Sequence, residues 1–164
     1  KNIQVVEILD KAYYQLHLEA PQKKVLLFEM KSLLPKSALS EQEAKEVAQK
    51  SLKTPSEILK TEYLTTTNGH HEYREKPLPA YAVTFGTPNN TTVYVATELG
   101  TVQTYRNNEW RIFDFLWMLH VMDYENRDNI NNWILRIFSL IGLITILSGF
   151  FLFFLTSKFK TQRK

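Results

Sequence analysis

The longest hydrophobic stretch of the chain lies near its C-terminus, where residues 137–155 contain no charged side chain. As an α-helix, this stretch would span about 28 Å, close to the hydrocarbon thickness of a bilayer. Each Leu, Ile or Phe favours insertion by about 0.3–0.6 kcal/mol, whereas a central Arg would cost about 2.5 kcal/mol or more. We therefore expect a transmembrane helix over 133–157, with the guanidinium of Arg136 reaching the interface at one end. The alternative is an amphipathic hairpin inside a large soluble core.

A second helix is predicted over 40–52 by its capping residues. Ser40 is a good N-cap, and Glu43 completes a capping box by reaching back to the N–H of the cap. Leu39 and Ala44 can form a hydrophobic staple beside it. A narrow apolar stripe follows at helical spacing, so we expect this helix to lie on a sheet. The stripe consists of Ala44, Val47, Ala48 and Leu52.

Alternating apolar and polar residues after Pro55 predict an antiparallel β-meander. Its strands read ILKTEYLTTT, PAYAVTF, TTVYVAT and TVQTYRN, with turns at Asn68-Gly69 and over 86–90. The alternation predicts one dry face and one solvent-facing face, and the capped helix should cover the dry one. The expected fold class is therefore α+β, a small antiparallel sheet covered by a helix. A juxtamembrane helix and a C-terminal transmembrane helix should follow.

Residues 1–38 show no clean period, and we expect them to form a partial strand and helix segment. Val5, Ile8 and Tyr13 could lie on a short helix, with 15–19 extended. Four consecutive apolar residues bounded by lysines predict a buried strand over 23–31, followed by a turn at Pro35. No signal peptide is visible. Either a targeting segment was removed or, as we favour, a further membrane helix precedes this segment.

Residues 109–132 are apolar on nearly every side over their first half, yet that half is too short to span a bilayer. We expect a juxtamembrane amphipathic segment along the outer interface, where Trp110, Trp117 and Trp133 favour the headgroup depth. The alternative is a core helix under the sheet. The expected organisation is thus an N-terminal segment 1–38, a domain 39–108, the juxtamembrane segment 109–132, the membrane helix 133–157 and a basic tail 158–164.

The charges that flank the membrane helix predict its orientation. Four basic residues follow it without any acidic residue, whereas acidic and basic residues are mixed before it. By the positive-inside rule, we expect the tail in the cytoplasm and residues 1–132 outside it. The net charge of +3 is more than accounted for by this tail, so the outer domain lacks the basic surplus of nucleic-acid-binding proteins. The basic tail residues are Lys158, Lys160, Arg163 and Lys164.

The sequence offers few groups for catalysis. The chain has no cysteine, which excludes disulfides, thiolate metal sites and cysteine nucleophiles. It also lacks G-x-S-x-G, H-E-x-x-H and a phosphate-binding glycine loop. His17 is expected on a strand, facing solvent. His70 and His71 fall in a predicted turn and point apart, so we do not expect a shared metal. An enzyme is therefore not expected.

Several motifs resemble the PepSY domain. They are the capped helix, P-x-Y-x-V at 79–83, VYV-x-T at 93–97 and the E-L-G turn at 98–100. The string WRIFDFLWMLHVMDYENRDNINNWILRIF, leading into an apolar helix, is similar to PepSY-associated transmembrane proteins. The resemblance covers roughly 39–157 and includes one complete repeat. It implies a small domain outside the bacterial cytoplasmic membrane, held by flanking helices. The family roles divide between binding or restraining peptidases and taking part in haem-linked, iron-uptake or other redox systems.

The predicted membrane helix carries small residues on one face. They fall within roughly a third of its circumference and would let another helix approach closely. We expect this face to contact a transmembrane helix of the same protein or of a partner subunit. Chance composition is the alternative explanation. The residues are Ser139, Gly142, Thr145 and Gly149.

His120 is the one titratable residue with candidate chemistry. Asp123 lies three residues on, so on a helix its carboxylate could accept from one imidazole nitrogen and leave the other for a metal. Together with the resemblance, this spacing makes His120 a candidate ligand of haem b. A second axial ligand would have to come from an upstream helix or another subunit. The simpler alternative is a histidine and an acid that stabilise a juxtamembrane turn.

Two functions are compatible with these patterns. We favour a membrane-anchored, non-catalytic interaction module, an accessory subunit of a larger membrane complex, which needs no cofactor. The alternative is a haem-linked component of a membrane electron-transfer or iron-reduction system. The expected partners are the lipid bilayer, other transmembrane helices or subunits, and a peptidase or a redox enzyme, but not nucleic acid.

Overall fold

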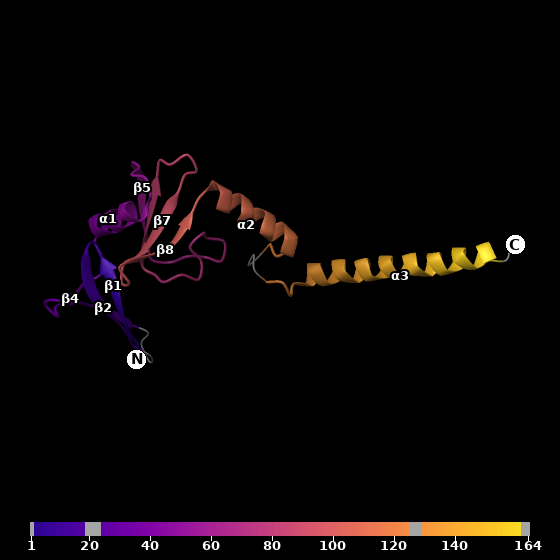
Figure 1. Ribbon diagram of the computed structural model, residues 1–164, viewed down its shortest axis with the longest axis horizontal. Coiled ribbons are helices and arrows are strands. Elements are labelled where there is room, and N and C mark those ends of the chain that lie inside the picture. Colours follow the sequence, from indigo (N-terminus) through magenta and orange to yellow (C-terminus); the bar gives the residue numbers. More distant parts are fainter. Residues whose placement is uncertain (1, 19–23, 125–128, 162–164) are drawn as a thin grey trace. The chain divides into compact units, whose positions relative to one another are not determined.

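The protein was analysed as a computed structural model, which describes residues 2–18, 24–124 and 129–161 (Figure 1). The chain forms two compact units, Lys1–Phe113 and Asp114–Lys164. The first unit contains two antiparallel sheets and one helix, and the second contains the apolar C-terminal helix. The α+β class is therefore confirmed.

The first sheet is formed by the N-terminal residues, and this corrects the expected helix. Val5, Ile8 and Tyr13 lie on two paired strands, joined at Leu9 and Asp10, whose φ angles are 50° and 66°. Two consecutive positive φ angles are typical of a tight hairpin turn. A strand is present over Lys24–Glu29, but Leu27 is the one residue of its apolar run that is buried. Lys23 lies outside the described residues, and Pro35, where a turn was expected, lies on the next strand. The sheet has the order β1-β2-β3-β4, with β1 at Asn2–Ile8, β2 at Lys11–Leu18, β3 at Lys24–Glu29 and β4 at Pro35–Lys36.

The second sheet is the predicted meander, and helix α1 (Glu41–Ser51) packs on it. The predicted capping box is present, since the Ser40 side chain accepts from the Glu43 N–H and the Glu43 carboxylate accepts from the Ser40 N–H. Ala44 and Ala48 are buried on α1, where their small side chains allow the helix to lie close to the strands. The strands are β5 (Ile58–Leu64), β6 (Ala80–Phe85), β7 (Thr92–Ala96) and β8 (Thr101–Arg106).

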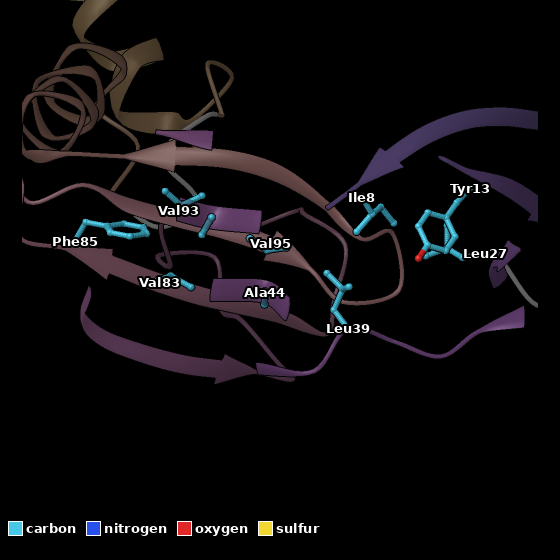
Figure 2. Packing of buried hydrophobic residues seen from close by; sticks show 10 residues of the cluster. Ile8, Tyr13, Leu27, Leu39, Ala44, Val83, Phe85, Val93 and Val95 are labelled. Atoms are coloured by element: carbon cyan, nitrogen blue, oxygen red, sulfur yellow. The ribbon is translucent and has the colours of Figure 1, made fainter. Parts of the chain in front are cut away.

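One hydrophobic core joins the two sheets of the first unit. Figure 2 shows Ile8, Tyr13 and Leu27 of the first sheet at one end of the cluster, and Phe85 of the second sheet at the other. Gly100 lies at the junction with a φ of +70°, and a Cβ there would collide with Cδ1 of Ile8. Residues 2–36 therefore share a core with the domain expected over 39–108.

The second face of the meander is only partly left to solvent, so the expectation of one solvent-facing side is only partly correct. Tyr73, from the segment between β5 and β6, is fully buried against Ala80, Ala82 and Tyr94. All five residues of β7 are buried in consequence. The long segment 65–79 thus covers part of this face.

The second unit contains the predicted membrane span. Helix α2 (Asn108–Val121) crosses the boundary between the units and ends before Met122, whose φ is 53°. Helix α3 (Trp133–Thr161) contains Trp133–Ser157, the one helix in the described residues that is long and apolar enough to cross a membrane. These bounds match the predicted span of 133–157.

Candidate functional site

The surface of α3 is the most distinctive feature of the second unit. Its large apolar side chains are exposed, and no residue of Trp133–Ser157 is buried by the described part of the chain. Exposed apolar surface on this scale is unfavourable in water but is what a lipid-facing helix presents. The exposure is consistent with a membrane anchor and disfavours the alternative of a soluble core.

The start of α3 is fixed by polar side chains. Asn132 caps the helix, because its Oδ1 accepts from the Leu135 N–H at 2.8 Å. Its Nδ2 donates to the Val121 carbonyl at 2.7 Å, which ties the end of α2 to the start of α3. Arg136 donates from Nε and Nη2 to Asn131 Oδ1 at 3.0 and 2.7 Å. Arg136 is therefore held toward the polar connector, as expected for a residue at an interface.

The predicted small-residue face lies on α3 and remains unpaired within the described residues. A Cβ at Gly142 or Gly149 would meet nothing within 4 Å. Ser139 and Thr145 donate to carbonyls one turn earlier, at 2.8 and 2.9 Å, so their hydroxyls carry no unsatisfied donor into lipid.

The small-residue face contains a shallow pocket at Gly149. Its volume is about 400 Å³, and Ile146, Gly149, Phe150 and Phe153 line it. Positions i, i+3, i+4 and i+7 are the four corners of a hole that accepts a side chain from a neighbouring helix. Association through this face stays a prediction.

Most of the large apolar side chains of α2 are exposed. Its two buried residues are Asp114 and Val121, whereas large apolar side chains along it are 39–62% exposed. These exposed side chains disfavour the alternative of a core helix under the sheet, and the interfacial placement expected for 109–132 stays a prediction. The exposed side chains are Ile112, Phe113, Phe115, Leu116, Trp117 and Leu119.

The three predicted interfacial tryptophans differ in environment. Trp133 is 70% exposed and Trp117 is 39% exposed. Trp110 is half-buried, and the Arg106 guanidinium lies 3.8 Å from the centre of its ring. A cation above the ring gives Trp110 a role within the first unit. Trp117 and Trp133 therefore remain the better candidates for contact with headgroups.

The helical spacing assumed for His120 and Asp123 does not hold, because α2 ends at Val121 and Met122 has a positive φ. Asp123 is buried, and its Oδ2 accepts from the Asn129 N–H at 2.8 Å. His120 is exposed, with its ring 6.0 Å from that of Trp117. Asp123 thus shapes the connector to α3, which agrees with the carboxylate's part in the turn-stabilising alternative but not with a pair that includes His120.

The side chains of the second unit do not by themselves fit a b-type haem. His120 is the only histidine in the sequence after residue 71. Such a haem usually takes two axial ligands, so at least one would have to come from outside this unit. Among the described residues, no group of three or more metal-ligating side chains comes together. The haem role of His120 remains a prediction that requires a second chain segment.

A polar cleft that the sequence analysis missed lies on the second face of the meander. Its volume is about 620 Å³. Its most ordered feature is an ion pair, with Arg111 Nε 2.5 Å from Glu72 Oε1 and Arg111 Nη2 3.1 Å from Glu72 Oε2. The lining also includes Lys60, Glu62, His70, His71 and Tyr94.

The cleft side chains mostly satisfy one another. Besides Glu72, Arg111 donates to Thr92 Oγ1, the Asn90 carbonyl and Asn108 Oδ1 at 3.1–3.3 Å. The hydrogen bond to Glu72 raises the pKa of the Arg111 guanidinium. Lys60 forms its own ion pair with Glu62 at 2.7 Å. This arrangement fixes the start of α2 on the sheet and supplies no activated nucleophile.

Tyr94 lines the cleft and stacks on the buried Tyr73. The rings of Tyr73 and Tyr94 lie 4.8 Å apart and are nearly parallel. Burial raises the pKa of Tyr73 to about 12. Burial, and then the negative charge of Glu72, raise the pKa of Tyr94. Both phenols are therefore neutral and structural at physiological pH. A lone tyrosine in the polar segment 65–79 was the signal that could have indicated this contact.

The remaining histidines take local roles. Nδ1 of His71 accepts from the Tyr73 N–H at 3.0 Å, which helps to place the buried tyrosine. His17 lies half-buried on β2, with Nε2 3.0 Å from Gln15 Oε1. Its expected solvent-facing position is thus only partly correct.

Comparisons of this chain with protein-family models, curated proteins and solved structures find no match.

Proposed function

We propose that this protein is a membrane-anchored, non-catalytic interaction module that serves as an accessory subunit of a larger membrane complex. The observation that carries the proposal is that one chain contains both the exposed apolar helix Trp133–Ser157 and a compact α+β unit that ends at Phe113. The helix matches the thickness of a bilayer, and its exposed surface calls for lipid or another helix. The first unit then supplies the protein surface on which a partner docks.

The proposed location rests on the resemblance of the juxtamembrane string and on the charges that flank the helix. We place the chain in a bacterial cytoplasmic membrane with residues 158–164 in the cytoplasm and the first unit outside. The four basic residues of the tail support this orientation under the positive-inside rule. Membership of the PepSY class remains part of the proposal, and it rests on the motifs at 79–83 and 93–100 together with the juxtamembrane string.

The non-catalytic role is supported by the polar cleft. Glu72 and Arg111 are engaged with each other, and the tyrosines beside them have pKa values far above neutrality. The partner that we propose is a peptidase or a redox enzyme of the same membrane. A haem-linked role for His120 would need a ligand from that partner or from another helix.

Extraction from membranes tests the anchor. Membranes containing the full chain are washed with alkaline carbonate, and we expect the protein to remain in the pellet. A variant with Leu143→Arg and Leu147→Arg should be released, because each central Arg costs about 2.5 kcal/mol or more. The control, Leu33→Arg and Leu34→Arg, changes two exposed residues of the first unit and should stay in the pellet. Release of the unaltered chain would refute the proposal.

Co-purification tests the interaction role. The full chain, solubilised in mild detergent, should retain a stoichiometric membrane protein identifiable by mass spectrometry. Recovery of the chain without any other polypeptide, from membranes of its natural host, would contradict the accessory-subunit assignment. Turnover of a peptide or redox substrate by the purified chain alone would contradict the non-catalytic assignment.

A further inference from the structure

Strand β1 is an unprotected edge. Natural sheets block their edges with short strands, proline, bulges or basic side chains, because an open edge pairs with other strands. Strand β1 pairs with β2 in an unbroken register over seven residues, and no other strand among residues 2–18, 24–124 and 129–161 pairs with it. Its sequence, NIQVVEI, contains no proline, lysine or arginine and one charge, at Glu7.

The three other edges carry such devices. Strand β4 has two residues, one of them Pro35. Strand β5 has a register shift between Ile58 and Lys60, followed by a Lys60 to Glu62 ion pair. The pairing of β7 with β8 is also shifted, at Tyr94 and Val95. Strand β1 therefore differs from every other edge of the two sheets.

The outer face of the first sheet adds apolar surface next to this edge. Directly paired residues share a face in an antiparallel sheet. Ile3 pairs with Leu16 and Val5 with Tyr14, and these continue to Leu26 and Phe28 on β3. Ile3 and Val5 are 62% and 61% exposed, and the other four are half-buried. None of the six belongs to the core cluster, which lies on the opposite face.

The open part of β1 is its first half. Asn2, Ile3, Gln4 and Val5 are exposed, whereas Ile8 is buried against Gly100. A pairing strand can therefore reach Asn2 to Val6, a stretch centred on Gln4.

We propose that β1 pairs in an antiparallel manner with β1 of a second copy of this chain, about a two-fold axis at Gln4. This register places Ile3 opposite Val5 of the other copy, so the apolar outer faces of the two sheets become continuous. It places Asn2 opposite Val6, and Glu7 lies outside the paired stretch, so no like charges oppose each other. The strand is thus self-complementary, which a two-fold interface requires.

The size of the contact indicates how the dimer forms. Five residues extend over about 17 Å, and strands lie about 4.8 Å apart, so the contact covers a few hundred Å² per copy. A stable soluble complex buries about 800 Å² per partner. The pairing rests on the proposed membrane function, because anchoring in one membrane raises the effective concentration of the copies.

Disulfide trapping tests this register. The chain has no cysteine, so a single Gln4→Cys substitution places one thiol on the two-fold axis. Opposite residues of an antiparallel pair have Cα atoms about 4.5–5.5 Å apart, within the range of a disulfide. Oxidation of membranes containing the full chain should give a dimer band. The matched control is Lys60→Cys on the β5 edge, which should give at most a background band.

A second substitution makes the test specific. Adding Ile3→Lys to Gln4→Cys should lower the dimer fraction about tenfold, because a lysine on an edge strand blocks strand addition. Leu59→Lys, at a residue of similar exposure on β5, should leave the dimer fraction unchanged. A band for Gln4→Cys no stronger than that for Lys60→Cys, or a cross-link to a different polypeptide, would overturn the proposal. The carbonate wash of the same membranes reports the anchor independently, so failure of pairing is distinguishable from failure of the proposed function.

Discussion

Replacing Gly100 with alanine should destabilise the first unit through a specific collision. Gly100 has a φ of +70°, which costs a non-glycine residue about 1–3 kcal/mol. Its added Cβ would overlap Cδ1 of Ile8 and would lie 3.1 Å from Ile8 Cγ1. Overpacking of a core typically costs about 1–3 kcal/mol. We therefore expect Gly100→Ala to lower the free energy of unfolding by about 2–6 kcal/mol.

A second substitution isolates the collision. Ile8→Val removes Cδ1, the atom that the new methyl group would meet, and alone should cost about 0.5–1.5 kcal/mol. The double variant should retain the backbone strain at position 100 but lose most of the overlap. Its destabilisation should therefore be smaller than the sum of the single effects by about 1–3 kcal/mol.

Thermal unfolding of the full chain in mild detergent, followed by the circular dichroism of the strands, measures these effects. A change of 1 kcal/mol shifts Tm by roughly 4–8 °C for a domain of about this size. Additive effects of Gly100→Ala and Ile8→Val would refute the contact between the E-L-G turn and β1. They would also remove the argument that the two sheets share one core.

Three further predictions concern the capped helix and the membrane helix. Ser40→Ala should lower the free energy of unfolding by about 1 kcal/mol in the same thermal assay, and Ser40→Gly by only a few tenths. The hydrogen bond from Lys36 lowers the pKa of Glu43, so the stability that this pair contributes is present at neutral pH and is lost as the pH falls below about 4.5. Lys36→Met should make this loss of stability smaller in an acid titration. An acid titration that is the same for the variant and the unaltered chain would contradict the pairing. Gly142→Leu with Gly149→Leu should abolish co-purification with a partner helix while leaving carbonate resistance intact, and unchanged co-purification would count against the small-residue face.

Local signals were sufficient for three parts of the fold. The helix α1 follows from Ser40 and Glu43, whose capping contacts involve residues three apart. The meander follows from alternation, and α3 follows from the length of its apolar run. Each of these signals lies within one continuous stretch of sequence, so each can be recognised without knowing the tertiary contacts.

The first sheet could not be predicted in the same way. The apolar residues Val5, Ile8 and Tyr13 fit a helix as well as a strand over so short a stretch. The hairpin turn uses Leu9 and Asp10 instead of the glycine or asparagine that would have marked it. Pairing with β2 and β3, and burial of Ile8 against Gly100, decide the outcome.

The polar cleft could not be predicted from the sequence for a related reason. Glu72 and Arg111 are 39 residues apart, and no short motif joins them. The expected pairing of His120 with Asp123 failed because the helix ends at Val121, two residues before Asp123. The position of this helix end depends on the connector. There Asp123 accepts a hydrogen bond from the Asn129 N–H, and Asn132 donates one to the Val121 carbonyl. Spacing alone does not contain that information.

Labelling from the two sides of the membrane tests most directly the claim that α3 spans it. Ser37→Cys places a single thiol on an exposed residue of the first unit, and a cysteine added after Lys164 places one at the tail. In intact spheroplasts, a membrane-impermeant maleimide should label the thiol at position 37 and should label the tail only after permeabilisation. Labelling of both thiols without permeabilisation, or of neither, would put the two ends on one side and contradict the account.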